Sequence, residues 1–212
     1  SSEQAIVLYR EALESVPTHL PALKALERMH RSRSEWADLI DVLKRKVRAQ
    51  EEPELVLAAK LELAAAYEER LSDKSQAIEQ YRSVLETDDE NLQALKGLER
   101  LYGQQERWQE LMGVLERQLE LVGHEREQIV LLLRIAGMWE QEFLKHDKAA
   151  ERLEQVLDLD RSAVDALRGL QRLYRQMRRW PELISTYERH VEATGDRSEK
   201  AAMFQRIGEV YR

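Results

Sequence analysis

A repeat with a period of 72 residues constrains this chain more than any other feature of its sequence. The stretch Ala94–Tyr102 (ALKGLERLY) reappears upstream as Ala22–His30 (ALKALERMH) and downstream as Ala166–Tyr174 (ALRGLQRLY), with no insertion or deletion between the copies. An array of this kind buries the apolar face of each unit against its neighbours and needs no single central core. The predicted repeat units are residues 1–72, 73–144 and 145–212.

Each unit reads as four helices. The 212 residues include only eight glycines and four prolines, and strong helix formers dominate the rest. Apolar residues recur at helical spacing and stop at turn signals such as Pro17. We therefore expect an all-α chain of about twelve helices whose short turns make successive helices antiparallel neighbours. No linker or composition break interrupts the pattern, so residues 1–212 are expected to form one continuous domain.

Two local signals set helix boundaries in the first unit. Ser34 stands just before the apolar pattern that begins at Trp36, so it is predicted to be an N-cap. Pro53 is well placed to open the next helix, because proline is tolerated in a first turn. That helix is expected to continue to about Arg70.

Charge and composition exclude several classes of protein. A net charge of −7 argues against a general polyanion binder. The chain has no cysteine, which excludes disulfides and thiolate metal sites and fits a reducing compartment. The longest apolar run, Ile129 to Leu133, is far shorter than the roughly 20 residues of a membrane span. We expect a soluble, cytoplasmic protein, and because the chain begins at Ser1 without an initiator methionine, a fragment of a longer one.

No catalytic pattern is present in the sequence. His124 to Gln128 approaches the H-E-x-x-H helix of zinc proteases, but Gln128 removes the second imidazole ligand. There is no glycine-rich phosphate loop, no G-x-S-x-G elbow and no cysteine nucleophile. We therefore predict no enzymatic activity, no catalytic residues, no metal site and no cofactor. His30 occupies the position of Tyr102 and Tyr174 and is expected to be a packing residue.

When each unit is divided into two helix pairs of 36 residues, the motif of a known family emerges. Its first-helix positions are matched by Phe204, Ile207, Gly208 and Tyr211. Its second-helix positions are matched by Ala5, Tyr9, Ala12 and Pro17. The chain resembles the tetratricopeptide repeat family over its whole length, with HEAT-like hairpins as the alternative. The resemblance implies a right-handed superhelical solenoid that binds proteins and does no chemistry.

The resemblance is weaker in alternate pairs. There the small residue of the first helix is replaced by Glu27, Glu99 and Gln171, and the alanine of the second helix is replaced by Leu39, Leu111 and Leu183. Close approach of the helices is in doubt at those places. The pairing also leaves a single helix at each end of the chain, so we expect the terminal apolar residues to lack cover and to permit end-to-end self-association. These residues are Ile6, Tyr9, Leu13, Phe204, Ile207, Val210 and Tyr211.

The resemblance further implies that one face of each first helix lines a concave groove. On alternate first helices this face carries basic pairs, and on the intervening ones it carries apolar or small residues. Such alternation suits a partner segment that has both acids and apolar anchors. The residues expected to bind the partner are Lys24, Arg28, Leu61, Ala65, Lys96, Arg100, Leu133, Arg168, Arg172 and Arg175.

Several alternatives stay open at this point. Glu68, Glu69 and Glu140 lie near the same face, so the arginines can equally form ion-pair ladders between neighbouring helices. The three repeated tryptophans are expected to wedge the hairpin turns, with a ligand cage as the alternative. The chain can also act as a structural spacer or a self-assembling array through its ends. Nucleic acid is a weaker candidate partner, because the net charge is negative.

Overall fold

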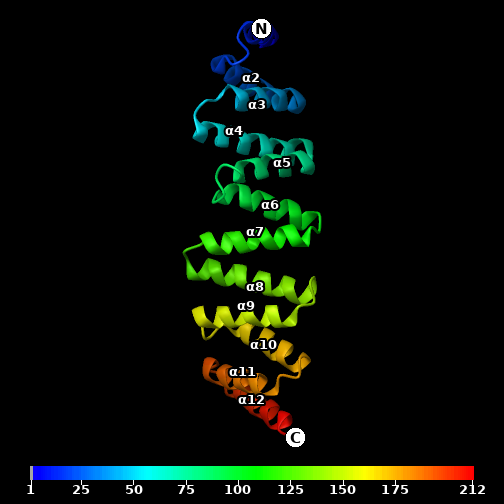
Figure 1. Ribbon diagram of the computed structural model, residues 1–212, viewed down its shortest axis with the longest axis vertical. Helices are drawn as coiled ribbons and strands as arrows, with labels where there is room; N and C mark the ends of the chain where they lie inside the picture. Colours follow the sequence, from blue (N-terminus) through cyan, green and yellow to red (C-terminus); the bar gives the residue numbers. More distant parts are fainter. Residues whose placement is uncertain (1) are drawn as a thin grey trace. The chain divides into compact units, whose positions relative to one another are not determined.

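The computed structural model describes residues 2–212, and every regular element in that range is a helix. Within each of the two units described below, successive helices run antiparallel and are joined by short turns (Figure 1). The twelve α-helices of the described residues confirm the all-α prediction, and a single π-helical turn, η1, follows α4. Their bounds are α1 Ser2–Ser15, α2 Leu20–Arg33, α3 Trp36–Ala49, α4 Pro53–Ala66, η1 Tyr67–Leu71, α5 Lys74–Leu85, α6 Leu92–Gln104, α7 Trp108–Leu121, α8 Glu125–Gln141, α9 His146–Leu159, α10 Val164–Gln176, α11 Trp180–Ala193 and α12 Arg197–Val210.

The chain divides into two compact units. The first ends at Arg107 and contains α1 to α6; the second begins at Trp108 and contains α7 to α12. Within each unit every helix packs against the helix that follows it. The division falls in the turn between α6 and α7, inside the second 72-residue repeat. The expectation of one continuous domain over residues 1–212 stays a prediction.

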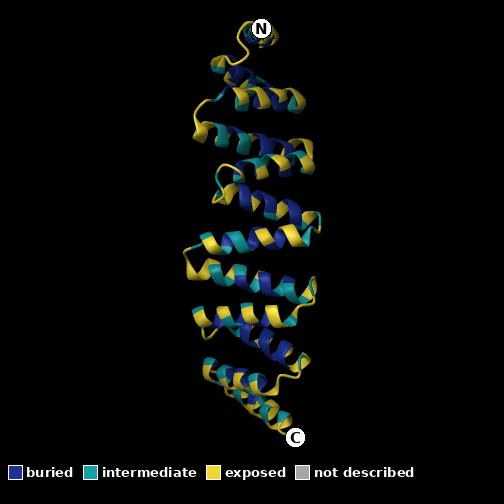
Figure 2. Cartoon of the chain, in the orientation of Figure 1, coloured by how far each residue is buried: buried dark blue, intermediate teal, exposed yellow. Residues whose placement is uncertain are grey.

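Each unit has an apolar core made by the helix faces that the sequence periodicity predicts. In the second unit, the buried faces of α9, α10 and α11 carry most of the core, and α10 is largely buried along its length (Figure 2). In the first unit, α1, α2 and α3 enclose a smaller cluster. The central residues of the larger cluster are Leu153, Leu157, Leu167, Leu170, Leu173, Leu183 and Tyr187. Those of the smaller cluster are Ile6, Leu13, Leu23, Leu26 and Val42.

The turn after α2 corrects one boundary prediction. Ser34 has a left-handed backbone (φ 58°), and its N–H donates to the carbonyl oxygens of His30 and Arg31, so it ends α2. The N-cap of α3 is Glu35, whose side chain makes no capping hydrogen bond. Many helices end with a residue in this left-handed conformation. Glu106 and Arg178, which lie one and two repeat periods after Ser34, also have a left-handed backbone, with φ angles of 55° and 58°.

The fourth helix also differs from expectation in its last turn. The α-helical hydrogen bonds end at Ala66, and Tyr67–Leu71 forms a wider π-helical turn before the left-handed Ser72. This turn lies within the helix that the sequence extends to about Arg70, and wide turns of this kind are frequent at functional sites. It carries Glu68 to the first-helix face described below.

Close approach of α5 and α6 depends on Gly97 rather than on the motif position that the sequence comparison questioned. A Cβ built on Gly97 would lie 2.5 Å from the ring of Tyr81. A Cβ on Gly169, one period later, would lie 2.7 Å from a terminal methyl group of Leu153. The first repeat has the buried Ala25 at this position.

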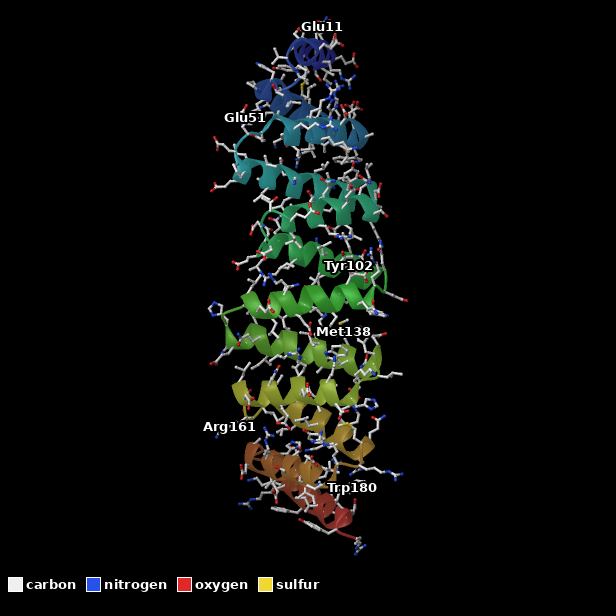
Figure 3. The ribbon with its side chains drawn as sticks, viewed as in Figure 1. Glu11, Glu51, Tyr102, Met138, Arg161 and Trp180 are labelled. Carbon is white, nitrogen blue, oxygen red and sulfur yellow. The ribbon has the colours of Figure 1, made fainter. Side chains whose placement is uncertain are left out.

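The terminal helices agree only in part with the sequence expectation. Ile6 and Leu13 are buried against α2, because α1 turns its apolar face toward its successor, so these residues do not lack cover. On α12, Phe204 is 59% exposed, and Tyr211, just beyond it, is 75% exposed. Trp36 and Trp108 are half-buried, whereas Trp180 at the start of α11 is exposed (Figure 3). No helix among residues 2–212 is long and apolar enough to cross a membrane.

Candidate protein-binding face

In each of the two units, the residues predicted to bind a partner lie on the even-numbered helices, and we call the side of these helices that carries them the first-helix face. In the first unit this face belongs to α2, α4 and α6, and in the second unit to α8, α10 and α12. The seven predicted basic residues, Lys24, Arg28, Lys96, Arg100, Arg168, Arg172 and Arg175, are exposed. The three small or apolar ones, Leu61, Ala65 and Leu133, are half-buried.

Two arginines of this face form forked ion pairs within their own unit. The Nε and Nη2 atoms of Arg100 donate to Glu68 at 3.1 and 2.9 Å. Those of Arg172 donate to Glu140 at 2.8 and 2.6 Å. The carboxylate partners raise the pKa of both guanidinium groups. These are the contacts that the ladder alternative names, yet each arginine side chain keeps more than half of its surface exposed.

The other basic residues of the first unit differ. The side chains of Lys24, Arg28 and Lys96 form no ion pair or hydrogen bond with any residue that the structure describes. Their charge is therefore available to a partner without the loss of an internal contact.

In the second unit the first-helix face is hollowed between α10, α11 and α12. The hollow has a volume of about 750 Å³, and its lining includes four arginines and two glutamates, an excess of two positive charges while His190 is neutral. Ala202 and Met203 add apolar surface to the lining. The predicted residues that the hollow brings together are Arg168, Arg172 and Arg175, and the sequence analysis missed Arg206.

A buried amide and imidazole form part of the wall of the hollow. Gln171 Nε2 lies 3.0 Å from Nδ1 of His190, which is 1% exposed. If the amide donates to Nδ1, the proton of the neutral imidazole is on Nε2, which has no hydrogen-bond partner within residues 2–212. The nearest carboxylate oxygen, Oε1 of Glu199, lies 3.4 Å from it.

Glu199 is held by its neighbours as a charged carboxylate. The hydroxyl of Thr194 donates to it at 2.7 Å, and Arg168 donates at 3.1 Å. The Thr194 hydrogen bond, followed by that of Arg168, lowers the pKa of Glu199. Arg168 is thus partly neutralised.

The two remaining arginines of the hollow have fewer charged neighbours. Arg175 donates from Nη2 to the hydroxyl of Tyr187 at 2.8 Å, a neutral partner. The Arg206 side chain has no hydrogen-bond or ion-pair partner among the described residues. Neither guanidinium group forms an ion pair with a residue that the structure describes.

In the first unit, the three residues equivalent to Gln171, His190 and Arg206 of the hollow form ion pairs with one another. Lys46 Nζ lies 2.9 Å from Glu27 and 2.6 Å from Glu62. Burial lowers the pKa of Lys46, but the hydrogen bonds that Lys46 donates to Glu62 and Glu27 outweigh this effect, so the net shift of the pKa is upward. Two periods later these positions are Gln171, His190 and Arg206. A comparison of charge between the repeats was the sequence signal that could have found the hollow.

A protein-family model matches each copy of the repeat motif. The tetratricopeptide repeat matches residues 22–56, 94–129 and 166–201, about half of the chain, and each match begins at the start of the 72-residue repeat motif. The chain belongs to the tetratricopeptide repeat family. Proteins of this family are generally protein–protein interaction scaffolds and are typically non-catalytic.

Several solved structures are similar to this chain. A tetratricopeptide repeat protein from Parabacteroides merdae is 15% identical, with a TM-score of 0.50 over 95% of this chain and 74% of that one. MamA is 18% identical, with a TM-score of 0.49 over 84% of this chain and 96% of that one. YrrB, described as a TPR protein with an unusual peptide-binding site, is 15% identical, with a TM-score of 0.48 over 79% and 82%. No curated protein matches the sequence.

Proposed function

We propose that this chain is a non-catalytic interaction module that binds an acidic, partly apolar protein segment on its first-helix face. The observation that carries the proposal is the hollow between α10, α11 and α12, where four arginines surround a lining that includes Ala202 and Met203. An excess of positive charge beside apolar surface favours a segment in which acids alternate with apolar side chains. A buried apolar anchor would supply affinity, and the arginines would supply specificity and speed of association.

The ion pairs of this face are compatible with binding. A guanidinium group has five N–H donors in a planar fork, and Arg172 uses one edge of it for Glu140. The pair therefore holds the guanidinium in place while other donors stay exposed. Exposed ion pairs contribute only about 0 to 1 kcal/mol, so a ligand carboxylate can compete with them.

Selection of random short peptides displayed on phage tests this function directly. We expect the selected peptides to combine Asp or Glu with large apolar residues, and their affinity to fall as salt is added, because the attraction acts between solvent-accessible charges. Selection that yields no peptide, or only basic peptides, would contradict the proposal.

A matched pair of charge reversals locates the site. Arg206→Glu breaks no internal contact and should weaken binding of a selected peptide at least about tenfold. Arg161→Glu makes the same change of charge in the turn between α9 and α10, outside the hollow (Figure 3), and should have little effect. Equal loss in both variants would remove the hollow from the proposal and leave only a general charge effect.

Self-association is a second candidate function, favoured by exposed aromatic surface on and just after α12. Phe204 and Tyr211 are 59% and 75% exposed, and exposed apolar groups of this size often mark an interface. A second copy of the chain is the proposed occupant. Sedimentation velocity should show association that grows with protein concentration and disappears in Phe204→Ser; a concentration-independent monomer would exclude this function.

A further inference from the structure

The turn between α2 and α3 differs chemically from the equivalent turns of the other repeats. The third repeat has Tyr174, Arg179 and Glu182 at the three positions concerned, and the second has Tyr102, Arg107 and Glu110. The first repeat has His30, Glu35 and Asp38. An aromatic–cation–acid set is therefore replaced by three residues that each offer a metal ligand.

In the later repeats these side chains interact with one another. The guanidinium of Arg179 lies 5.2 Å from the ring centre of Tyr174, within the range of a cation–π contact, and Arg179 pairs with Glu182 at 2.6 Å. Arg107 lies 4.7 Å from the ring centre of Tyr102 in the same manner. The arginine is thus the element that closes this turn.

The first repeat brings its three candidate ligands together instead. His30 Nδ1 lies 2.6 Å from Oε2 of Glu35, and one ligand atom from each of His30, Glu35 and Asp38 lies within 4.8 Å of the other two. His30 is 1% exposed, and its Nε2 has no hydrogen-bond partner within the described residues. The imidazole is therefore fixed by packing, while the two carboxylates reach it from the solvent side.

We propose that His30, Glu35 and Asp38 bind a divalent transition-metal ion of the zinc class. One imidazole and two carboxylates form a ligand set that suits Zn²⁺ and Co²⁺, with water completing the coordination. Metal–ligand distances of about 2.0 to 2.2 Å in a tetrahedral site separate the ligand atoms by about 3.4 Å. The ligand atoms lie within 4.8 Å of one another, so ion binding would require the two partly exposed carboxylates to turn while the buried imidazole keeps its place.

Two arginines face the same carboxylates and compete with the ion. Arg10 of α1 pairs with Asp38 at 2.7 Å, and Arg33 lies 3.5 Å from Glu35. The Arg10 and Asp38 side chains are about half exposed, and exposed ion pairs of this kind contribute little.

The ion would join the last turn of α2 to the first turn of α3. His30 lies near the end of α2, Glu35 is the N-cap of α3 and Asp38 lies in its first turn. The ion would then stabilise this hairpin in the way that Arg179 closes the hairpin of the third repeat. The inference is independent of the peptide-binding function, because none of these residues lines the hollow between α10, α11 and α12.

The chain supplies its own control for the experiment. Purified, metal-free protein is titrated with Co²⁺, the visible absorption of bound Co²⁺ is recorded, and Zn²⁺ is then added as a competitor. We expect one saturable Co²⁺ site, displacement by Zn²⁺ and a higher melting temperature in the presence of Zn²⁺. The double variant His30→Tyr/Glu35→Arg gives the first repeat the residues of the third and should lose all three signals.

The reverse exchange tests for a gain of binding. Tyr174→His/Arg179→Glu, beside the native Glu182, should create a second Co²⁺ site in the third repeat. Asp38→Asn changes the site with the least effect on packing and should weaken Co²⁺ binding at least about tenfold, with unchanged circular dichroism. Absence of binding to the wild-type protein, or equal binding to His30→Tyr/Glu35→Arg, would overturn the proposal; the second result would mean an adventitious ion only.

Discussion

The first and third repeats share a helical frame but differ in how their first-helix faces use charge. At one set of equivalent positions, the first repeat has Lys46 held between Glu27 and Glu62, and these three residues satisfy one another. The third repeat has Gln171, His190 and Arg206, which leave a buried imidazole nitrogen and a guanidinium without hydrogen-bond partners among the described residues.

This difference shows that the residues that determine the fold of the repeat are not the residues that set the charge of its surface. The leucines that fix the frame are buried in both repeats, whereas the polar positions between them contribute little to the core and are free to change. Net charge at the three positions changes from negative to positive while the period of 72 residues is kept. At these three positions, the third repeat thus carries the positive charge on which the proposed binding of an acidic segment rests.

The largest expected effect comes from exchanging these positions. Gln171→Glu/His190→Lys/Arg206→Glu gives the third repeat the closed network of the first, so binding of a selected acidic peptide should fall by more than about tenfold, as measured by fluorescence anisotropy. The melting temperature should change little, because the new side chains can pair with one another. Unchanged affinity would show that the hollow is not the binding site.

The two close-approach glycines should respond differently to alanine. Gly97→Ala places a methyl group against the rigid ring of Tyr81, at 2.5 Å, so we expect a loss of about 1 to 3 kcal/mol in the free energy of unfolding. Gly169→Ala meets only the end of the flexible Leu153, and the gain in helix propensity of about 1 kcal/mol should offset the contact. Urea denaturation followed by circular dichroism measures both, and equal losses would contradict the distinction.

Alkaline stability should depend on one tyrosine in each unit. Burial, followed by the charge of Glu68 or Glu154, raises the pKa of Tyr81 and of Tyr174 from 10.0 to about 12. A raised folded-state pKa gives stability that is fully present below pH 10 and is lost as the pH rises toward 12. Urea denaturation at a series of pH values should show this decline.

Phenylalanine substitution isolates the contribution of each unit. Tyr81→Phe and Tyr174→Phe should each make the alkaline decline shallower, because a group that cannot ionise adds no pH dependence. If neither variant changes the slope between pH 10.0 and about 12, the tyrosines are not its source.

The smallest expected effect concerns the repeated left-handed turns. Ser34 and Arg178 adopt φ 58°, a conformation that costs an L-residue energy and that glycine adopts freely. Glycine at either position should raise the free energy of unfolding by about 0.5 kcal/mol, after allowance for the greater freedom of glycine in the unfolded chain. Similar gains in the two turns would support their equivalence, and a loss in either one would contradict it.

The helices were predictable from the sequence because apolar periodicity is a local property that recurs three times. The α2–α3 turn was not, since Ser34 is a common N-cap residue and no glycine marks the left-handed position there. The pairing of Arg100 with Glu68 was foreseen only as an alternative, because charge and spacing do not decide between an internal acid and a partner.

The hollow and the histidine cluster needed the structure. Nothing in the sequence distinguishes Arg206 from other exposed arginines on helices. Only the structure shows that it lines the hollow together with residues of α10 and α11. His30 was read as a packing residue, and it is indeed buried. The sequence did not reveal that the carboxylates of Glu35 and Asp38 lie close to the His30 imidazole across the turn.

The sequence separation of the ion-paired residues has a consequence for the folding rate. The ion pairs Arg100–Glu68 and Arg172–Glu140 each join residues 32 positions apart in the sequence. The ion pair Arg152–Glu116 joins residues 36 positions apart. These contacts close loops of only one hairpin repeat, so the entropy lost on closing each of them is modest. Low contact order of this kind favours fast folding that starts in one hairpin and spreads to the next. Kinetic refolding should therefore be sensitive to which hairpin is weakened, and the slowest step should be nucleation of the first hairpin rather than assembly of distant segments.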